Sequence, residues 1–242
     1  MTSPETPAAP QTPPPSAASL ALHVFDDPAG TFAKLAARPT AWLPIVLIVL
    51  VSAFAQFMMP VQLQRQQAER MMQRIEQRTG NPIPQATRDA QLAKIASPVR
   101  RVTGAVSAII MALVILVIIA AVCKLIFGAG APEPIKFRQE FAVVAHANIV
   151  WLLGMVVTTF MIRATGRLDA GVSLGFLAPS GFAHAYLTLV SVWAVWFVVL
   201  LAIGNKVLAR SKSLTGPLVI LGALWLVLNI PFAFLMKFAM GL

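Results

Sequence analysis

The sequence predicts an all-α membrane protein, a bundle of about five transmembrane helices, and three observations support that fold class. The chain of 242 residues is 58% hydrophobic and only 12% charged, whereas soluble domains carry roughly 25% charged residues. Its mean hydropathy is +0.78. Five segments approach or exceed the ~20 apolar residues that a helix needs to cross hydrocarbon, and none has an acidic residue between its ends.

These segments divide the chain into a tail and one transmembrane domain, residues 20–242. The predicted spans are 41–60, 102–127, 141–162, 183–208 and 217–238. Residues 1–19 are rich in Pro, Ser and Thr and contain no Lys or Arg, so they predict a disordered tail and not a signal peptide.

A short amphipathic helix is predicted before the first span. Either of the two aspartates that precede Pro28 can cap a helix starting there, and Phe32 and Leu35 then share one face. We expect this helix to lie in the membrane interface, with Trp42 in the aromatic belt at the start of the span.

Residues 61–101 form the longest polar segment and hold eight of the nineteen basic residues. An apolar stripe at helical spacing is followed by the breaker 80–84 and by a second helical pattern. The two sets of apolar positions are Ala68, Met71, Met72 and Ile75, then Leu92, Ile95 and Ala96. The pattern predicts a helical hairpin outside the hydrocarbon.

The formal net charge of +10 does not indicate nucleic-acid binding, because no basic patch carries interleaved aromatic residues. Basic residues beside apolar spans suit the lipid bilayer and its anionic headgroups. The single cysteine, Cys123, excludes an intrachain disulfide and a CxxC metal pair. We expect no cofactor and no metal.

Charge does not settle the orientation of the five spans. With a cytoplasmic N-terminus, eight basic residues lie inside and eleven outside, which is close to a tie under the positive-inside rule. If the basic residues of the 61–101 hairpin are not counted, because its two helices can fold as a unit, eight basic residues lie inside and three outside.

Several segments resemble the Yip1 family in its bacterial form. They are 25–32 followed by Arg38-Pro39, 141–147, 189–193 and 200–204. The likeness covers about 25–242, and the five-span layout matches as well. One departure is Asn148-Ile149, where family members often carry a proline.

The resemblance implies a cytoplasmic N-terminus and association with other membrane proteins, or with itself, through helix packing. It supplies no catalytic residues. Eukaryotic relatives act in vesicle trafficking with small GTPases, a role we do not carry over to a bacterial-looking chain. We expect a bacterial inner-membrane protein with the C-terminus and the 61–101 hairpin on the outer side.

Four polar residues at predicted membrane depth are candidate functional positions: His146, Asn148, His184 and Asn229. In a small transporter or channel subunit they would form a polar track or proton relay. The simpler interpretation is interhelical hydrogen bonding, at about 0.6 kcal/mol each on average. Two histidines are too few for a metal site.

Two further patterns concern helix shape and packing. Gly104, Ala108 and Ala112 follow the small-xxx-small spacing that lets helix backbones approach closely. Pro231 falls inside the fifth span, where it removes one backbone donor and predicts a kink.

Residues 171–175 match G-x-S-x-G with Ser173 at its centre, but no strand precedes them as a hydrolase elbow requires. An intramembrane protease would also need a histidine within reach of Ser173, and His184 follows eleven residues later. A Gly-rich interfacial loop explains the residues better. We therefore expect a non-enzymatic membrane scaffold, with a small transporter as the alternative.

Overall fold

The computed structural model describes residues 16–95, 97–167, 170–178 and 180–240, and these residues are helical apart from turns and one isolated β-bridge. The helices are α1 (Ala17–His23), α2 (Pro28–Ala37), α3 (Trp42–Met58), α4 (Val61–Thr79), α5 (Gln85–Ile95), α6 (Pro98–Gly128), α7 (Phe137–Ala147), α8 (Ile149–Thr165), the 3-10 helix η1 (Leu174–Leu177), α9 (Gly181–Leu189), α10 (Val192–Leu208) and α11 (Thr215–Met240).

Three described helices are long and apolar enough to cross a membrane: α6, the near-continuous α7–α8 (Phe137–Thr165) and α11. A fourth is added if α2 and α3, which are bent by 119° relative to each other, count as one span. These helices contain the predicted spans 102–127, 141–162 and 217–238. The predicted total of five is not reached by length and composition alone, because α3 and α10 have 17 residues each.

The predicted span 183–208 is not one helix. It is interrupted at Val190 and Ser191 between α9 and α10. The Val190 carbonyl accepts a hydrogen bond from the Leu174 amide at 2.9 Å, and the Ser191 hydroxyl caps α10 by accepting from the Ala194 amide at 3.1 Å. A tertiary contact with the preceding loop therefore breaks a segment whose apolar composition alone predicts continuity.

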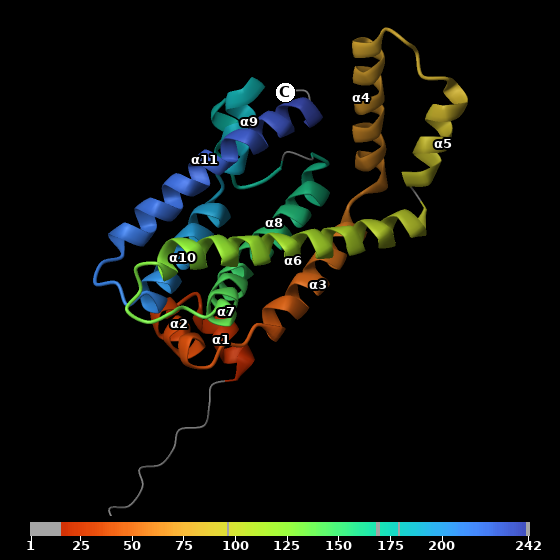
Figure 1. Cartoon of the computed structure of the whole chain (residues 1–242). Coiled ribbons are helices and arrows are strands. Elements are labelled where there is room, and N and C mark those ends of the chain that lie inside the picture. The colour runs from red at the N-terminus through yellow and green to blue at the C-terminus, as the bar shows by residue number, and fades with distance from the viewer. Residues whose placement is uncertain (1–15, 96, 168–169, 179, 241–242) are drawn as a thin grey trace, which may run out of the picture.

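The long helices run back and forth between two ends of the molecule (Figure 1). One end, called here the N-terminal end, holds α1, α2, the start of α7 and the end of α10. The opposite end holds α4, α5, α9 and the C-terminal part of α11.

The core lies where α2, α6, α7 and α10 meet. Phe32 and Leu35 of α2, Val143 and Val144 of α7, and Ala202 of α10 are all completely buried there. Of the most apolar stretch of α7–α8, 56% of the residues are buried, against 17% in α6 and 17% in α11. The pair α7–α8 is thus the central helix, and α6 and α11 present apolar faces outward.

Helix α2 forms as predicted, but its surroundings differ from our expectation. Asp27 caps it by accepting from the Gly30 amide at 2.9 Å. Its apolar face is covered by α7 and α10 and not left free for the membrane interface, because Phe32 and Leu35 pack into the core. An amphipathic pattern specifies an apolar contact and does not say whether lipid or protein provides it.

The predicted disordered tail falls largely on residues 1–15, which lie outside the described part. Its last residues are ordered, however, because α1 begins at Ala17 and Ser16 caps it, accepting from the Ser19 amide at 3.1 Å. Leu20, Ala21 and Val24 at the end of this segment are buried.

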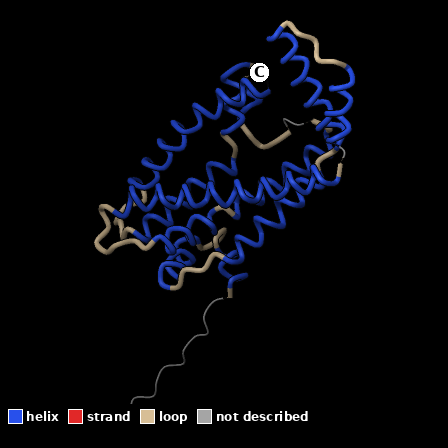
Figure 2. Tube along the Cα trace, turned by 45° about the vertical axis from the view of Figure 1, so that its right-hand side comes forward, coloured by secondary structure: helices blue, strands red, loops and turns tan. Residues whose placement is uncertain are grey.

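Helices α4 and α5 pack against each other and stand off from the bundle at its edge (Figures 1 and 2). Gly80, with φ of 67°, ends α4, and its amide donates to the Glu76 carbonyl at 2.9 Å. A positive φ of this size is easily adopted by glycine. The two helices and their connection are called the arm below.

Candidate functional site: buried polar positions in the bundle

Glu140 is the most deeply buried acidic residue of the described chain, and it is not among the candidate positions predicted from the sequence. It lies in the first turn of α7 and is completely buried. Neither carboxylate oxygen has a hydrogen-bond partner among the described residues. It shares one helix face with Val143, Val144 and Ala147, all completely buried. Extending the apolar i, i+3, i+4, i+7 pattern of the third span back by one residue identifies it.

Two polar side chains from other helices lie next to Glu140. They are Asn205 of α10, which is completely buried, and Cys123 of α6, which is 1% exposed. The Asn205 amide nitrogen donates to the Leu201 carbonyl at 3.0 Å, while its oxygen has no partner among the described residues. Three helices therefore each bring one polar group to a single point in the core.

This cluster is costly to bury, because a carboxylate without a counter-ion or hydrogen bond is strongly disfavoured in an apolar interior. Chemically it offers one carboxyl group, one amide and one thiol. Among the described residues, no group of three or more His, Cys, Asp or Glu side chains is placed to hold a metal ion. Proton exchange is the chemistry that the Glu140 carboxyl itself provides.

His146 and Asn148 lie near the junction of α7 and α8. His146 is 1% exposed, and its Nδ1 lies 2.9 Å from the Ala142 carbonyl oxygen, so this nitrogen donates. Its Nε2 has no partner in the described part of the chain. Asn148 is half-buried, and its backbone amide donates to the Val144 carbonyl at 3.0 Å, which continues the helical hydrogen-bond pattern from α7 toward α8.

His184 and Asn229 lie elsewhere. The Nδ1 of His184 lies 3.0 Å from the Gly175 carbonyl oxygen and 2.8 Å from that of Ala178, so His184 holds the loop before α9. Asn229 lies on α11, 8% exposed. Within the described residues, no hydrogen bond joins any two of His146, Asn148, His184 and Asn229.

Ser173 and His184 are not paired. The Ser173 hydroxyl accepts from the Gly175 amide at 3.4 Å, and His184 contacts backbone carbonyls. Ser173 also forms the isolated antiparallel bridge with Ser191. This loop thus holds the break between α9 and α10.

The packing positions have mixed surroundings. A side chain at Gly104 would meet Gln56 of α3 at 2.8 Å, and Ala112 packs against the core. Ala108, between them, is exposed. Helix α11 continues through Pro231, which is also exposed.

Comparison with known proteins gives one result. The family model for the Yip1 domain matches residues 22–236 of the chain, a range that includes every buried polar position described above. Neither a curated protein nor a solved structure matches the chain.

Proposed function

The chain belongs to the Yip1 domain family, and from this premise we propose that it is a non-enzymatic scaffold of the membrane whose arm binds another membrane protein. The family and the apolar helices fit an integral membrane protein. The observation that carries the scaffold role is the arm itself, an ordered polar element standing apart from the bundle (Figure 1).

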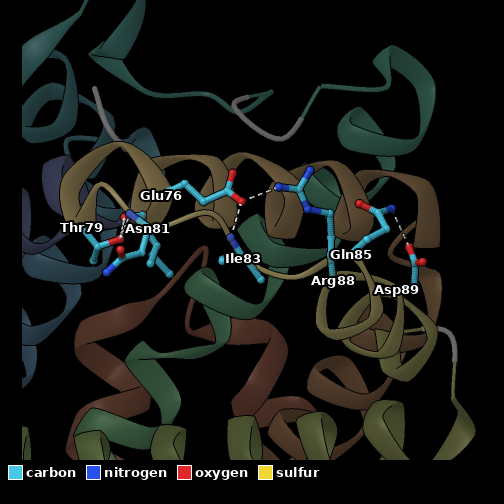
Figure 3. A network of polar contacts seen from close by, with 8 residues as sticks. Glu76, Thr79, Asn81, Ile83, Gln85, Arg88 and Asp89 are labelled. Atoms are coloured by element: carbon cyan, nitrogen blue, oxygen red, sulfur yellow. Dashed lines mark hydrogen bonds and ion pairs between the residues drawn. The ribbon is translucent and has the colours of Figure 1, made fainter.

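The arm is held in shape by its own polar contacts, which Figure 3 shows at the turn between its helices. One Glu76 oxygen accepts from the Ile83 amide and from the Arg88 guanidinium, both at 2.7 Å. These contacts lower the pKa of Glu76, the Ile83 amide more than Arg88. A preorganised element loses less conformational entropy on binding, which favours a recognition role.

The surface of the arm combines charge with exposed apolar groups. Residues 61–95 hold six basic and three acidic side chains, a surplus of three positive charges. On α4, Met71 is 57% exposed and Ile75 is 43% exposed, one turn apart. An apolar pair within a basic surface suits a partner that is acidic around an apolar patch.

We extend the proposal to five membrane passes. Helices α3 and α10 are short, but 17 residues at 1.5 Å each are within the lower range for a span. We propose a cytoplasmic N-terminus in a bacterial inner membrane, as the resemblance to the family implies, and five alternating passes would then leave the arm and the C-terminus on the outer side. A reporter fused after Leu242 should then be active outside the cytoplasm, and cytoplasmic activity would overturn this orientation.

A photo-crosslinking amino acid placed at Met71 in native membranes tests the scaffold role. We expect a discrete adduct that disappears when Ile75→Glu is added, because the charge disrupts the apolar contact. The same probe at Gln73, an exposed residue of the same helix, is the control and should give no such adduct. Equal adducts at both positions would contradict the proposal.

A second function, proton-coupled transport, is favoured by Glu140. A buried carboxyl on a helix that can span a membrane is by default a candidate for a proton pathway. The separate positions and local bonds of His146, Asn148, His184 and Asn229 favour the scaffold instead. Proton flux in vesicles containing the purified protein, abolished in Glu140→Gln, would support transport, while flux equal to empty vesicles would support the scaffold.

A further inference from the structure

A groove of about 340 Å³ opens at the N-terminal end of the bundle. Residues 39–41, which connect α2 to α3, form one wall together with Trp42 and Ile45 of α3. Arg138 and Phe141 of α7 form the other. Each wall includes the first turn of a helix that crosses the membrane in the proposed five-pass arrangement. In that arrangement the groove lies where the headgroups of one leaflet meet the hydrocarbon.

Two contacts fix the walls. The Gln139 amide nitrogen donates to the Ala36 carbonyl at 2.7 Å and so ties the start of α7 to the end of α2. The rings of Phe137 and Phe141 stack with their centroids 6.1 Å apart. The groove is therefore built by tertiary contacts between segments about a hundred residues apart in sequence.

Arg138 brings positive charge to this groove. Arg138 is exposed, and neither it nor Arg38, which precedes the groove, forms an ion pair within the described residues. A larger groove of about 480 Å³ at the same end includes Arg210, but Arg210 pairs with Glu133 at 2.8 Å. Of the two grooves, only the first is thus lined by an arginine that has no ion pair among the described residues.

The remaining lining is apolar and aromatic. Trp42 is 60% exposed, in the position of an interfacial aromatic residue, with Ile45 one turn deeper along α3. The first turn of α3 has no side-chain cap, so its free amide hydrogens add partial positive charge. Cationic and apolar surfaces side by side match an amphiphilic anion.

We propose that this groove binds the phosphate headgroup of an anionic phospholipid, with Arg138 donating to the phosphate and Trp42, Ile45 and Phe141 contacting the start of an acyl chain. A guanidinium can bond two phosphate oxygens at once. A lipid without a compensating amine is favoured, since a headgroup ammonium would face Arg138. The inference rests on the membrane placement of the chain and not on the scaffold role.

Native mass spectrometry of the purified full chain in detergent tests the site, with phosphatidylglycerol and phosphatidylcholine of identical acyl chains as probes. We expect Arg138→Gln to weaken the first phosphatidylglycerol binding step by about tenfold, corresponding to one charge-assisted contact. The Arg138→Lys variant should bind phosphatidylglycerol with an affinity between those of the wild type and Arg138→Gln, because lysine keeps the charge and loses the bidentate geometry. Phosphatidylcholine binding should be unchanged by either substitution.

Lys212→Gln is the matched control. Lys212 is exposed at the same end of the bundle but does not line the groove, so this substitution removes one positive charge elsewhere. Equal weakening in Lys212→Gln would show a general charge effect and overturn the site. So would wild-type binding in Arg138→Gln, or a change in oligomeric mass that shows a second copy in the groove. Displacement of the lipid by glycerol 3-phosphate would overturn the lipid in favour of a free phosphate compound.

Discussion

The junction of α2, α7 and α10 and the arm are stabilised in opposite ways. At the junction, completely buried apolar side chains surround the carboxyl group of Glu140, which has no hydrogen-bond partner among the described residues. In the arm, most side chains are exposed, and the turn between the helices is held by the polar contacts of Glu76. Burial dominates the first region, and local hydrogen bonds and charge dominate the second.

The difference explains how the two regions can have separate roles. Packing at the junction is sensitive to volume and insensitive to solution conditions. The arm depends on exposed polar contacts, which respond to pH and salt. Its α4 helix packs mainly on α5, so the arm can change while the bundle persists.

The largest effect is expected from Phe32→Ala. This side chain of α2 is completely buried where α2 packs against α10, and its removal should lower the free energy of unfolding by about 3–5 kcal/mol. Reversible unfolding in mixed micelles measures the change. Phe176→Ala is the control, because Phe176 is 80% exposed and should change stability little. Similar losses in both would contradict the central place of α2.

Gly204→Ala should have the next largest effect. A side chain at Gly204 would collide with Val143 Cγ1 and lie 3.5 Å from the Phe32 ring. Because valine is stiff, we expect a loss of about 1–3 kcal/mol in the same assay. Gly222→Ala on α11, where nothing lies within 4 Å, should be neutral or slightly stabilising. A neutral Gly204→Ala would mean that α2, α7 and α10 are less closely packed.

Acidification should loosen the arm before the bundle. The pKa of Glu76 in the folded arm is lowered from 4.5, chiefly by the Ile83 amide and then by Arg88. Its stabilisation is therefore fully present above the unfolded pKa and is lost as pH falls through the lower folded pKa. Hydrogen exchange of the 76–88 amides should accelerate in that range.

Two variants separate this effect from general acid sensitivity. Glu76→Gln should accelerate exchange of the same amides at neutral pH and remove most of the acid dependence. Glu69→Gln, on the same helix with no ion pair among the described residues, should behave as wild type. Acceleration that is equal in α7 and in the arm would contradict the independence of the two regions.

The smallest effect is expected from Glu140→Gln. The amide keeps the shape of the side chain and removes the carboxyl that has no counter-ion, so stability should stay within about 1 kcal/mol of wild type or rise. Glu140→Ala, which leaves a cavity, should be clearly destabilising in the same unfolding assay. A large loss in Glu140→Gln would indicate that the carboxyl has a partner in the membrane-embedded protein.

The sequence predicted much of the fold from local information. Hydropathy located the helices that became α6, α7–α8 and α11, and the aspartate before Pro28 correctly marked the start of α2. The breaker at 80–84 separated α4 from α5. The resemblance to the Yip1 family is confirmed by the match to residues 22–236.

The candidate site was predicted less well. Glu140 was missed because it adjoins a basic, polar segment and lies just before the apolar run of the third span, so it was taken to be outside the span. Of the four candidate positions at predicted membrane depth, His146 and Asn229 are buried in the structure. Which polar groups lie together depends on contacts between α6, α7 and α10.

By itself, the sequence determined that the chain is a helical membrane protein with a polar segment between its first two long apolar regions, because composition and periodicity are local properties. Tertiary structure alone decided that α2 is covered by protein, that Val190 and Ser191 interrupt an apolar segment, and that Glu140 lies beside Asn205 and Cys123. Each of these depends on which distant surface meets an apolar or polar face. A sequence pattern specifies whether a face needs an apolar or a polar contact, and only the packed fold specifies which part of the chain provides that contact.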